Sequence, residues 1–339
     1  MPRRDYRLVS ARGFPAHPVR VLCCALVLLA CALARVALAA DAWPARPVRL
    51  VIPFSPGGST DVIGRAVAQR MGDALGQPFV VENVPGASTL IGAERVARSA
   101  ADGYTLFVGT STTFSINPHL YRKWPYKIED FAPVSLIAKA PLVLAVSPAL
   151  AVKTLQEFAA YARARPGELA YGTTGRGSNA HLTGAMIAAA LGIRTTDVPY
   201  KGTAPALTDL MGGSLLVHMS STESALPLYK GGKIRVLAIT SEQRAQTAPE
   251  VPTFAELGYP VVSSYTLMGL FAPGGTPRPI VDALNAAVKR ALQAEDLLAR
   301  LWRDATVAEW TTPERTLEVF RADRDQAGRI IRSTGIALE

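Results

Sequence analysis

One pattern recurs along this chain and limits its fold: an apolar strand, a turn rich in glycine, serine and threonine, and then a helix. The clearest copy spans residues 49–71. Its first part, RLVIPF, is an apolar run with β-branched Val51 and Ile52, which is typical of a buried strand. The letters SPGG end the strand, and apolar residues then recur at helical spacing. Strands that alternate with helices predict parallel sheets joined by right-handed crossovers.

The turn at 55–60 predicts a helix start that attracts an anion. Ser59 and Thr60 are residue types that cap helices, and Asp61 adds a negative charge to the first turn. Free N–H groups and the positive dipole end at a helix N-terminus favour anions, and small residues let a ligand approach the backbone. An ordinary strand-to-helix turn has similar composition, so this turn alone leaves both interpretations open.

Similar turns follow other strands, at 109–113, 173–179 and 201–203. Further strands are expected at 78–82, 104–109, 168–174, 195–200, 215–219, 234–239 and 263–272, and further helices at 88–99, 155–164, 180–191, 204–211, 252–257, 277–293 and from 312 onward. Two apolar runs at 134–137 and 142–146 would fit a crossing between two lobes. Ligands of such sheets collect beyond the carboxyl ends of the strands. Turns from both lobes are therefore expected to surround a carboxylate with N–H groups and hydroxyls, without a buried arginine.

The first 39 residues predict an export signal. A basic segment with arginines up to Arg20 precedes an apolar stretch at 21–34, which is short for a membrane span. Residues 37–39 (ALA) then fit a cleavage signal. A retained anchor, a lipoprotein site at Cys31 and a twin-arginine signal at residues 3–4 are alternatives that the sequence leaves open.

Cleavage after residue 39 would remove all three cysteines, which are Cys23, Cys24 and Cys31. Export without disulfides requires a core large enough to fold unaided, and the loss of cysteine excludes thiolate catalysis. The segment also holds six of the 36 Lys/Arg and one of the 27 Asp/Glu, which leaves 30 against 26. This small excess gives no indication of nucleic-acid binding. About 300 remaining residues are typical of two α/β lobes.

Residues 175–180 (GRGSNA) formally match a dinucleotide-binding motif, with Asp197 about 20 residues further on. Export argues against a nicotinamide enzyme, and Asp197 sits early in its strand rather than at the carboxyl end. The histidines after the signal show no metal-ligand spacing; they are His119, His181 and His218. There is no G-x-S-x-G elbow. We expect no cofactor, no metal and no catalysis, and His181 either lines the cleft or packs in the first helical turn.

The whole chain after the signal resembles the extracytoplasmic solute receptors of the tripartite tricarboxylate transporter family, the Bug group. The segments that carry the resemblance include WPARPVRLVIPFSPGGSTD (43–61), GQPFVVENVPGAS (76–88), ADGYTLFVGTS (101–111), YGTTGRGSNAHL (171–182), VPYKGTAPALTDLMGG (198–213) and GLFAPGGTP (269–277). The resemblance implies an α/β type II periplasmic-binding-protein fold, in which two lobes close on a ligand cleft. We expect lobe limits of 40–140 plus 266–339 for one lobe and 141–265 for the other.

The family's binding elements correspond to the loops at 54–61 and 173–181. The residues expected to contact ligand are Phe54, Ser55, Gly57, Gly58, Ser59, Thr60, Asp61, Ser111, Thr173, Thr174, Gly175, Arg176, Gly177, Ser178, Asn179, His181 and Ser220. Ser220 stands where relatives often carry an aspartate, which disfavours an amino-acid ligand. Arg176 stands where a small or apolar residue is common; contact with a second carboxylate and exposure to solvent both remain open.

The resemblance thus implies a periplasmic monomer that binds a small mono- or dicarboxylate and delivers it to a membrane permease. A sensory protein that presents its ligand to a membrane signalling partner would use the same structure, and the sequence does not separate these roles.

Overall fold

The computed structural model describes residues 43–121, 123–334 and 336. The expected export signal at 1–39 lies outside the described residues. Residues from Arg46 onward form one unit, to which the following description applies. Within the described part of the chain, no helix has both the length and the apolar character needed to cross a membrane.

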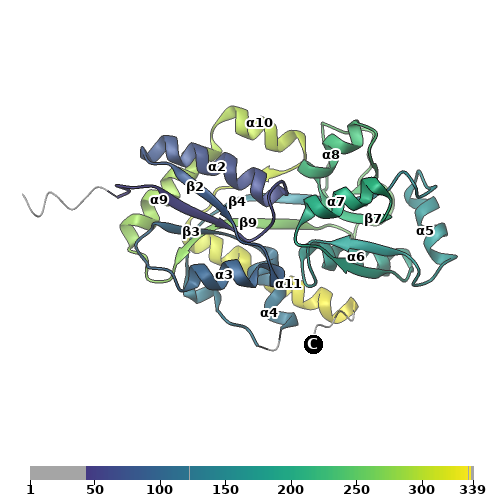
Figure 1. Ribbon diagram of the computed structural model, residues 1–339, viewed down its shortest axis with the longest axis horizontal. Coiled ribbons are helices and arrows are strands. Elements are labelled where there is room, and N and C mark those ends of the chain that lie inside the picture. The colour runs from purple at the N-terminus through teal and green to yellow at the C-terminus, as the bar shows by residue number, and fades with distance from the viewer. Residues whose placement is uncertain (1–42, 122, 335, 337–339) are drawn as a thin grey trace, which may run out of the picture. The chain divides into compact units, whose positions relative to one another are not determined.

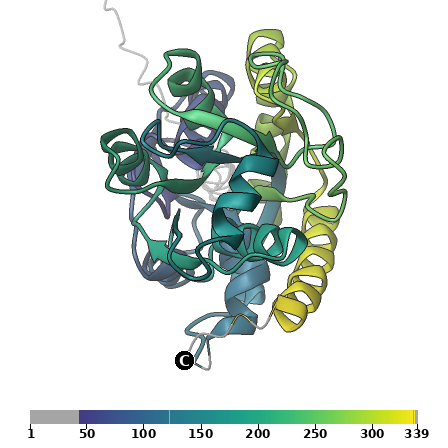
Figure 2. The same ribbon diagram turned by 90° about the vertical axis from the view of Figure 1, so that its right-hand side faces the viewer.

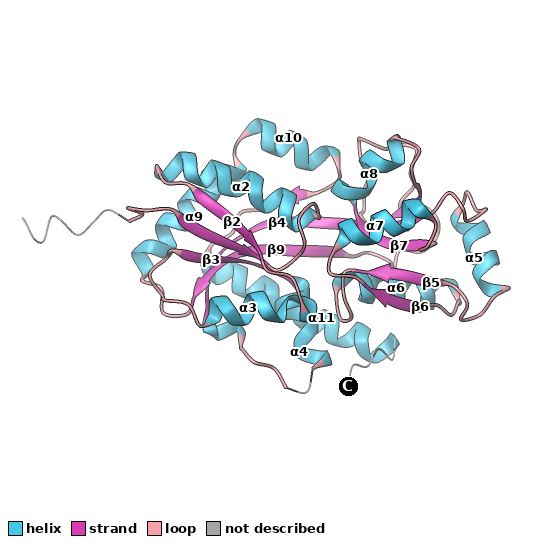
Figure 3. Cartoon of the chain, viewed as in Figure 1, coloured by secondary structure: helices cyan, strands magenta, loops and turns pink. Residues whose placement is uncertain are grey.

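Strands and helices alternate along most of the chain (Figure 3). The strands are β1 (Val48–Ile52), β2 (Phe79–Asn83), β3 (Thr105–Thr110), β4 (Phe131–Val146), β5 (Ala170–Thr173), β6 (Thr196–Pro199), β7 (Val217–Ser221), β8 (Arg235–Ile239), β9 (Tyr265–Pro273) and β10 (Val307–Ala308). The helices are α2 (Ser59–Leu75), α3 (Leu90–Ala97), α4 (Asn117–Leu120), α5 (Leu155–Arg163), α6 (Asn179–Leu191), α7 (Thr203–Gly212), α8 (Thr222–Lys230), α9 (Arg278–Leu292), α10 (Glu295–Arg303) and α11 (Pro313–Thr334). Shorter helical turns are η1 (Ala87–Thr89), η2 (Thr112–Ile116) and η3 (Ile128–Asp130).

Strand β4 belongs to two sheets (Figure 1). Its residues 131–141 pair with β9, and its residues 142–146 pair with β7, with β8 also on 143–146. The first lobe has the sheet order β2-β1-β3-β9-β4, and the second has β4-β7-β5-β6. The predicted crossing between lobes is therefore one continuous strand, while the exact lobe limits stay a prediction.

The sheets are mixed, so the expectation of parallel sheets was right only in part. Strands β1, β2 and β3 pair in parallel, as do β5, β6 and β7. Strands β4 and β9 pair antiparallel with each other and with their other neighbours. The reason is topological: β4 leaves the first lobe and β9 returns to it, so the two strands run in opposite directions.

The helix expected at 252–257 was wrong. This segment forms turns, in which the Glu256 carboxylate accepts the Thr253 N–H and Thr253 Oγ1 accepts the Glu256 N–H. Gly258 then takes a left-handed φ of 89°, which stops a helix after a single turn. The sequence analysis also missed α8, α10 and β10.

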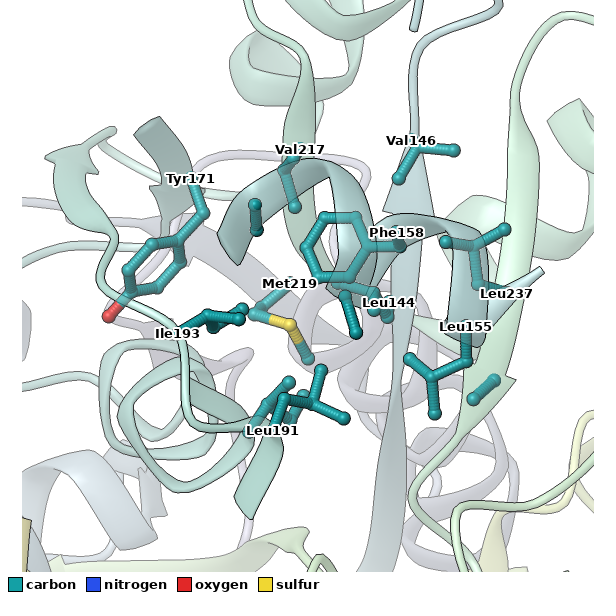
Figure 4. Close-up of a cluster of buried hydrophobic side chains, with 14 of the residues drawn as sticks. Leu144, Val146, Leu155, Phe158, Tyr171, Leu191, Ile193, Val217, Met219 and Leu237 are labelled. Atoms are coloured by element: carbon teal, nitrogen blue, oxygen red, sulfur yellow. The ribbon is translucent and has the colours of Figure 1, made fainter. Parts of the chain in front are cut away.

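Each lobe has its own core. In the first lobe, Phe114 packs against Phe131, Phe271 and Phe320, with ring centroids 4.6–5.7 Å apart. In the second lobe, side chains from β4, β7, α5 and α6 surround Met219 (Figure 4). Helix α11 contacts β4 and η2 and also touches α6 of the second lobe (Figure 2). A smaller apolar cluster of Ile116, Leu120, Leu182, Ala327 and Ile331 packs where α11 meets α6, so the lobes share an apolar contact there besides their separate cores.

Candidate functional site

The starts of α2, α6, α7 and α8 converge where the two lobes face each other. They surround a cavity of about 40 Å³, which we call the central cavity. The helix starts supply Gly58, Ser59, Thr60, Asn179, Ala180, Thr203 and Ser221 to its lining, and the remaining residues are Phe54, Thr112, Leu142, Thr174, Met219 and Thr266. Both lobes therefore contribute helix N-termini to one small space.

No side chain that lines the central cavity is charged. Its polarity comes from hydroxyls and from the N–H groups of the first helical turns, which carry partial positive charge. Such a set of donors matches a small anion such as a carboxylate, because the N–H groups can donate hydrogen bonds to its oxygens.

The cap of α2 differs from the sequence expectation. Gly58, not Ser59 or Thr60, is the N-cap, and no side chain caps the helix. Ser59 and Thr60 already lie inside the helix because Gly57, at φ 86°, turns the chain before it. Gly202 at α7 and Ser221 at α8 likewise cap without a side-chain hydrogen bond. These first-turn N–H groups are therefore not occupied by a capping side chain.

Asp61 holds the glycine loop rather than lining the cavity. Its carboxylate accepts the Gly57 N–H, Arg65 Nε and Asn83 Nδ2, each at 2.9 Å. Burial raises the pKa of Asp61, but hydrogen bonds from Arg65, Gly57 and Asn83 outweigh burial and lower it below the ordinary value. A charged Asp61 thus fixes the loop that leads into α2.

The loop at 173–179 is supported by His181. The Gly177 N–H donates to His181 Nδ1 at 3.0 Å, and the His181 N–H donates to Ser178 Oγ at 3.2 Å. Because Nδ1 accepts, the proton of the neutral ring is on Nε2, which lies 3.9 Å from Asp197. Burial lowers the pKa of His181, with Asp197 opposing this and Arg176 adding to it. The neutral imidazole packs under the loop, and its contact with a ligand stays a prediction.

Hydrogen bonds join the two lobes across the cleft. Ser55 Oγ donates to the Lys201 carbonyl at 2.8 Å, and Ser88 Oγ donates to the Arg176 carbonyl. The Asn179 backbone N–H donates to Thr112 Oγ1 at 3.2 Å. With the lobes joined in this way, the central cavity has room for only a few waters. A larger occupant therefore requires the lobes to separate.

A second cavity, of about 280 Å³, opens beside the central one, and we call it the mouth cavity. Phe54 and Thr174 line both cavities, so the two are adjacent. The mouth cavity is further lined by Pro53, Gly86, Ala87, Ser88, Thr89, Tyr121, Gly175, Arg176, Pro199, Tyr200 and Lys201.

One wall of the mouth cavity is strained. Ala87, Ser88 and Thr89 have φ values of 44°, 47° and 80°, which side chains rarely adopt. Asn117 Nδ2 donates to the Ser88 carbonyl at 2.7 Å, and Thr113 Oγ1 donates to Thr89 Oγ1 at 3.0 Å. These bonds hold Ser88 toward the second lobe.

The predicted site residues divide into three groups. Phe54, Gly58, Ser59, Thr60, Thr174 and Asn179 line the central cavity, and Gly175 and Arg176 line the mouth cavity. Supporting residues in the two loops are Ser55, Gly57, Asp61, Thr173, Gly177, Ser178 and His181. Ser111 instead accepts the Leu267 N–H at 3.0 Å and lines a larger groove beside α11, which meets the central cavity at Asn179.

Ser220 is fully buried on β7, and its hydroxyl has no hydrogen-bond partner among the described residues. Within the same part of the chain, no group of His, Cys, Asp and Glu side chains could hold a metal ion. The carboxylate of Asp197, which the dinucleotide motif would assign to a ribose, accepts Arg176 Nε at 3.3 Å.

Sequence reasoning missed several residues of the central cavity. Thr112 and Thr203 lie in turns whose composition marked them, so they could have been named. Thr266 is inside β9, and Ser221 ends β7 before an unexpected helix, so no local signal identified either.

Comparison with known proteins agrees with this arrangement. A family model described as the tripartite tricarboxylate transporter family receptor matches residues 63–336. Protein BugT from Bordetella pertussis is 37% identical over 304 residues, which cover 89% of this chain and 93% of BugT. An R. palustris protein solved with adipate has a TM-score of 0.85 and 35% identity, covering 88% of this chain and 100% of its own. MatC from Rhodopseudomonas palustris with bound malate has a TM-score of 0.80 and 33% identity, covering 85% and 100%. This chain therefore belongs to the receptor family of the tripartite tricarboxylate transporters.

Proposed function

We propose that this protein captures an organic acid in the periplasm and delivers it to a membrane permease. The observation that carries the proposal is the central cavity, where four helix starts meet and no lining side chain is charged. The adipate and malate bound by the two solved relatives support a carboxylate ligand. The protein acts as a receptor and carries out no chemistry on its ligand.

One carboxylate of the ligand is held between the start of α2 and the start of α6. The donors are first-turn N–H groups near Ser59 and Asn179, with the Thr203 hydroxyl beside them. The Asn179 N–H becomes available to the ligand when the lobes separate and its bond to Thr112 Oγ1 breaks. A hydrogen bond to a charged group contributes about 1.5–3 kcal/mol. Three or four such donors support a Kd of about a micromolar once the entropic cost of binding is subtracted.

The ligand lacks an ammonium group beside the carboxylate. No Asp or Glu lines the central cavity, and Ser220 stands where an aspartate would be expected for an amino-acid ligand. A buried ammonium without a counter-charge is strongly disfavoured. Organic acids should therefore bind better than the corresponding α-amino acids.

Capture involves closure of the lobes about β4 and β9. Pro141 pairs with Tyr265 at the end of their ladder, and Leu142 already pairs with Ser221 of the second lobe. This register supports lobe limits within one residue of 140/141 and 265/266. A hinge in two neighbouring strands lets the cleft open to admit ligand and close over it.

A panel of organic acids and matching α-amino acids, tested by thermal unfolding, tests the proposal. At least one acid should raise the Tm in a concentration-dependent way, because a ligand that binds only the folded state stabilises it. If no carboxylate raises the Tm and none is found by calorimetry, the proposal fails.

The variant Ser59→Pro locates the site. Ser59 is the first residue of α2 and follows Gly58 in an extended conformation, so proline fits the backbone and removes one N–H. The lost donor should weaken acid binding by about tenfold or more. Glu295→Pro is the matched control, because Glu295 is the first residue of α10, away from the cleft, after extended Ala294. Equal binding by Ser59→Pro and wild type would place the site elsewhere.

A further inference from the structure

A groove with a volume of about 680 Å³ lies beside α11, and we call it the α11 groove. Helix α11, β4 and β9 line it from the first lobe, and α6 and the segment 263–264 line it from the second (Figure 1). Cavities of about 300–1,000 Å³ are typical of small-molecule sites. The α11 groove therefore has room for a small organic molecule in the arrangement that the structure shows, whereas the central cavity does not.

The α11 groove is bordered by a carboxyl group that lacks a partner. Asp323 of α11 lines the groove, and its Oδ2 atom is buried with no hydrogen-bond partner among the described residues. Burial raises the pKa of Asp323, and the hydroxyls of Ser115 and Ser111 and the charge of Lys139 oppose this. A buried carboxyl oxygen without a donor costs free energy, which a ligand that supplies the donor would recover.

Two of the cations that line the α11 groove are already paired with other carboxylates. Lys139 Nζ lies 2.6 Å from Glu309 Oε2, and an Arg315 guanidinium nitrogen lies 2.9 Å from Glu318 Oε2. Neither cation forms an ion pair with Asp323 among the described residues. The charge that would balance an ionised Asp323 is therefore not supplied by these side chains.

The charges that remain unpaired leave the groove with a negative excess. Asp323 and Glu242 line it without an ion pair to any described residue, and Arg329 is the one lining cation in the same condition. Arg329 is exposed, so water screens its charge. This balance favours a cationic ligand over an anionic one.

The remaining walls of the α11 groove are suited to a hydrocarbon. Leu182 and Met186 of α6 face it from the second lobe, and Leu267, Val319 and Ile330 face it from the first. Leu182 and Leu267 are buried. A ligand that matches both the acid and these walls has a positive group at one end and an apolar body.

We propose that the α11 groove is a second ligand site, which binds a primary amine: its ammonium group bonds to Asp323, and its hydrocarbon body lies against Leu182, Leu267 and Val319. Asn179 forms the boundary with the central cavity. Its Nδ2 donates to Thr266 of the central cavity at 3.1 Å, and its Oδ1 accepts Ser264 Oγ of the groove at 3.4 Å. The amine and an organic acid therefore bind at the same time. This inference does not depend on the proposed function.

The experiment compares hexylamine with hexan-1-ol at neutral pH by protein-observed NMR, which measures affinities in the millimolar range. The alcohol keeps the length and loses the charge. Hexylamine should bind about tenfold more tightly than hexan-1-ol, the effect expected of one charge-assisted hydrogen bond. Along the series butylamine, hexylamine and octylamine, the affinity should rise by up to about fourfold for each added CH₂, because the walls are apolar.

Asp323→Asn should lower the affinity for hexylamine about tenfold, to that for hexan-1-ol, because the amide keeps the shape of the side chain and loses its charge. Asp325→Asn is the matched control: Asp325 is an exposed residue of the same helix that does not line the groove. Thermal unfolding of both variants verifies that they are folded.

Two results would overturn the amine site. The first is equal affinity for hexylamine and hexan-1-ol in the wild-type protein, or an affinity for hexylamine that Asp323→Asn leaves unchanged. The second is displacement of hexylamine by a saturating organic acid, since it would place the amine in the central cavity. Failure of every organic acid to bind, with hexylamine still bound through Asp323, would remove the carboxylate receptor and support the amine site.

Discussion

The hydroxyl of Ser224 donates a hydrogen bond of 2.9 Å to the carbonyl oxygen of Gly57. Ser224 lies in the first turn of α8 in the second lobe, and Gly57 lies in the glycine loop of the first. The same Ser224 oxygen accepts the hydroxyl of Ser221, which lines the central cavity. The lobe contact and the cavity wall are thus joined through a single side chain.

Ser224→Ala should weaken ligand binding with little loss of fold stability. A net hydrogen bond contributes about 0.5–1.5 kcal/mol, so affinity should fall about two- to tenfold as the closed arrangement loses this contact. Calorimetry with the best acid of the panel measures the effect. Ser99→Ala is the control, since Ser99 Oγ makes one bond to the Arg95 carbonyl inside the first lobe. Unchanged affinity in Ser224→Ala would show that this contact does not stabilise the bound state.

Gly177→Val should abolish acid binding while the protein stays folded. Gly177 has a φ of 75°, and its N–H donates to His181. A β-branched residue is strained there by about 1–2 kcal/mol, and relief of that strain would move the loop. Gly192→Val is the control at the other end of α6, where φ is 61° and the added side chain meets open space. Both variants should lose similar stability, and only Gly177→Val should lose affinity.

Ionisation of Glu223 should lower the free energy of unfolding as the pH rises toward neutrality. Burial raises the pKa of Glu223 to about 7, helped by repulsion from Asp304 and opposed by hydrogen bonds from Thr306 and Thr222. The folded state therefore holds this proton more tightly than the unfolded state, whose pKa is the ordinary 4.5. Its stabilising contribution is complete below about pH 4.5 and is lost as the pH rises to about 7, by about 3 kcal/mol in total.

Glu223→Gln should remove that loss. In urea unfolding between pH 5 and 8, the free energy of unfolding of Glu223→Gln should rise relative to that of wild type as the pH rises. The exposed control Glu168→Gln should show the same pH dependence as wild type. A constant difference between Glu223→Gln and wild type would contradict a buried, proton-binding carboxyl.

Protonation of His218 should lower the free energy of unfolding as the pH falls below neutrality. Burial lowers the pKa of His218 to about 4, against the hydrogen bond to the Gly172 carbonyl, which raises it. The unfolded state takes up the proton first, so the contribution is complete above about pH 6.5 and is lost as the pH falls to about 4. His218→Asn can keep a donor to Gly172 but cannot bind the proton, so its free energy of unfolding should fall less with acid. Exposed His119→Asn should retain the wild-type slope.

The alternation of strands and helices could be predicted from the sequence because each unit has local signals. Val51 and Ile52 sit in an apolar run, and Gly57 and Gly58 interrupt it. The direction of β4 and β9 could not be predicted locally, since it depends on which lobe each strand enters. Helix α8 was missed because Pro227 lies inside it and polar residues open it.

The loops of the candidate site were predictable, but the role of each side chain was not. Asp61 and His181 lie in the expected segments, yet both face backbone N–H groups of their own loops. Ser55 Oγ bonds to the Lys201 carbonyl and Ser88 Oγ bonds to the Arg176 carbonyl, and both contacts join the two lobes. Sequence spacing could not predict that Lys201 and Ser88 would line the same cavity. The four consecutive residues with positive φ at 86–89 also could not be predicted, because Gly86 is the only residue among them that favours such values.

The pairing of β3 with β9 determines the order in which the two lobes can complete their sheets. Phe107 of β3 lies opposite Phe271 of β9, and the whole second lobe is made between them. The second lobe can complete its own sheet apart from this pair, whereas the first must wait for β9, α9 and α11. A chain that emerges from its N-terminus therefore exposes an unfinished edge on β3 until β9 has followed. A chain cut short after β8 would retain the second lobe's strands and leave the first lobe's sheet open.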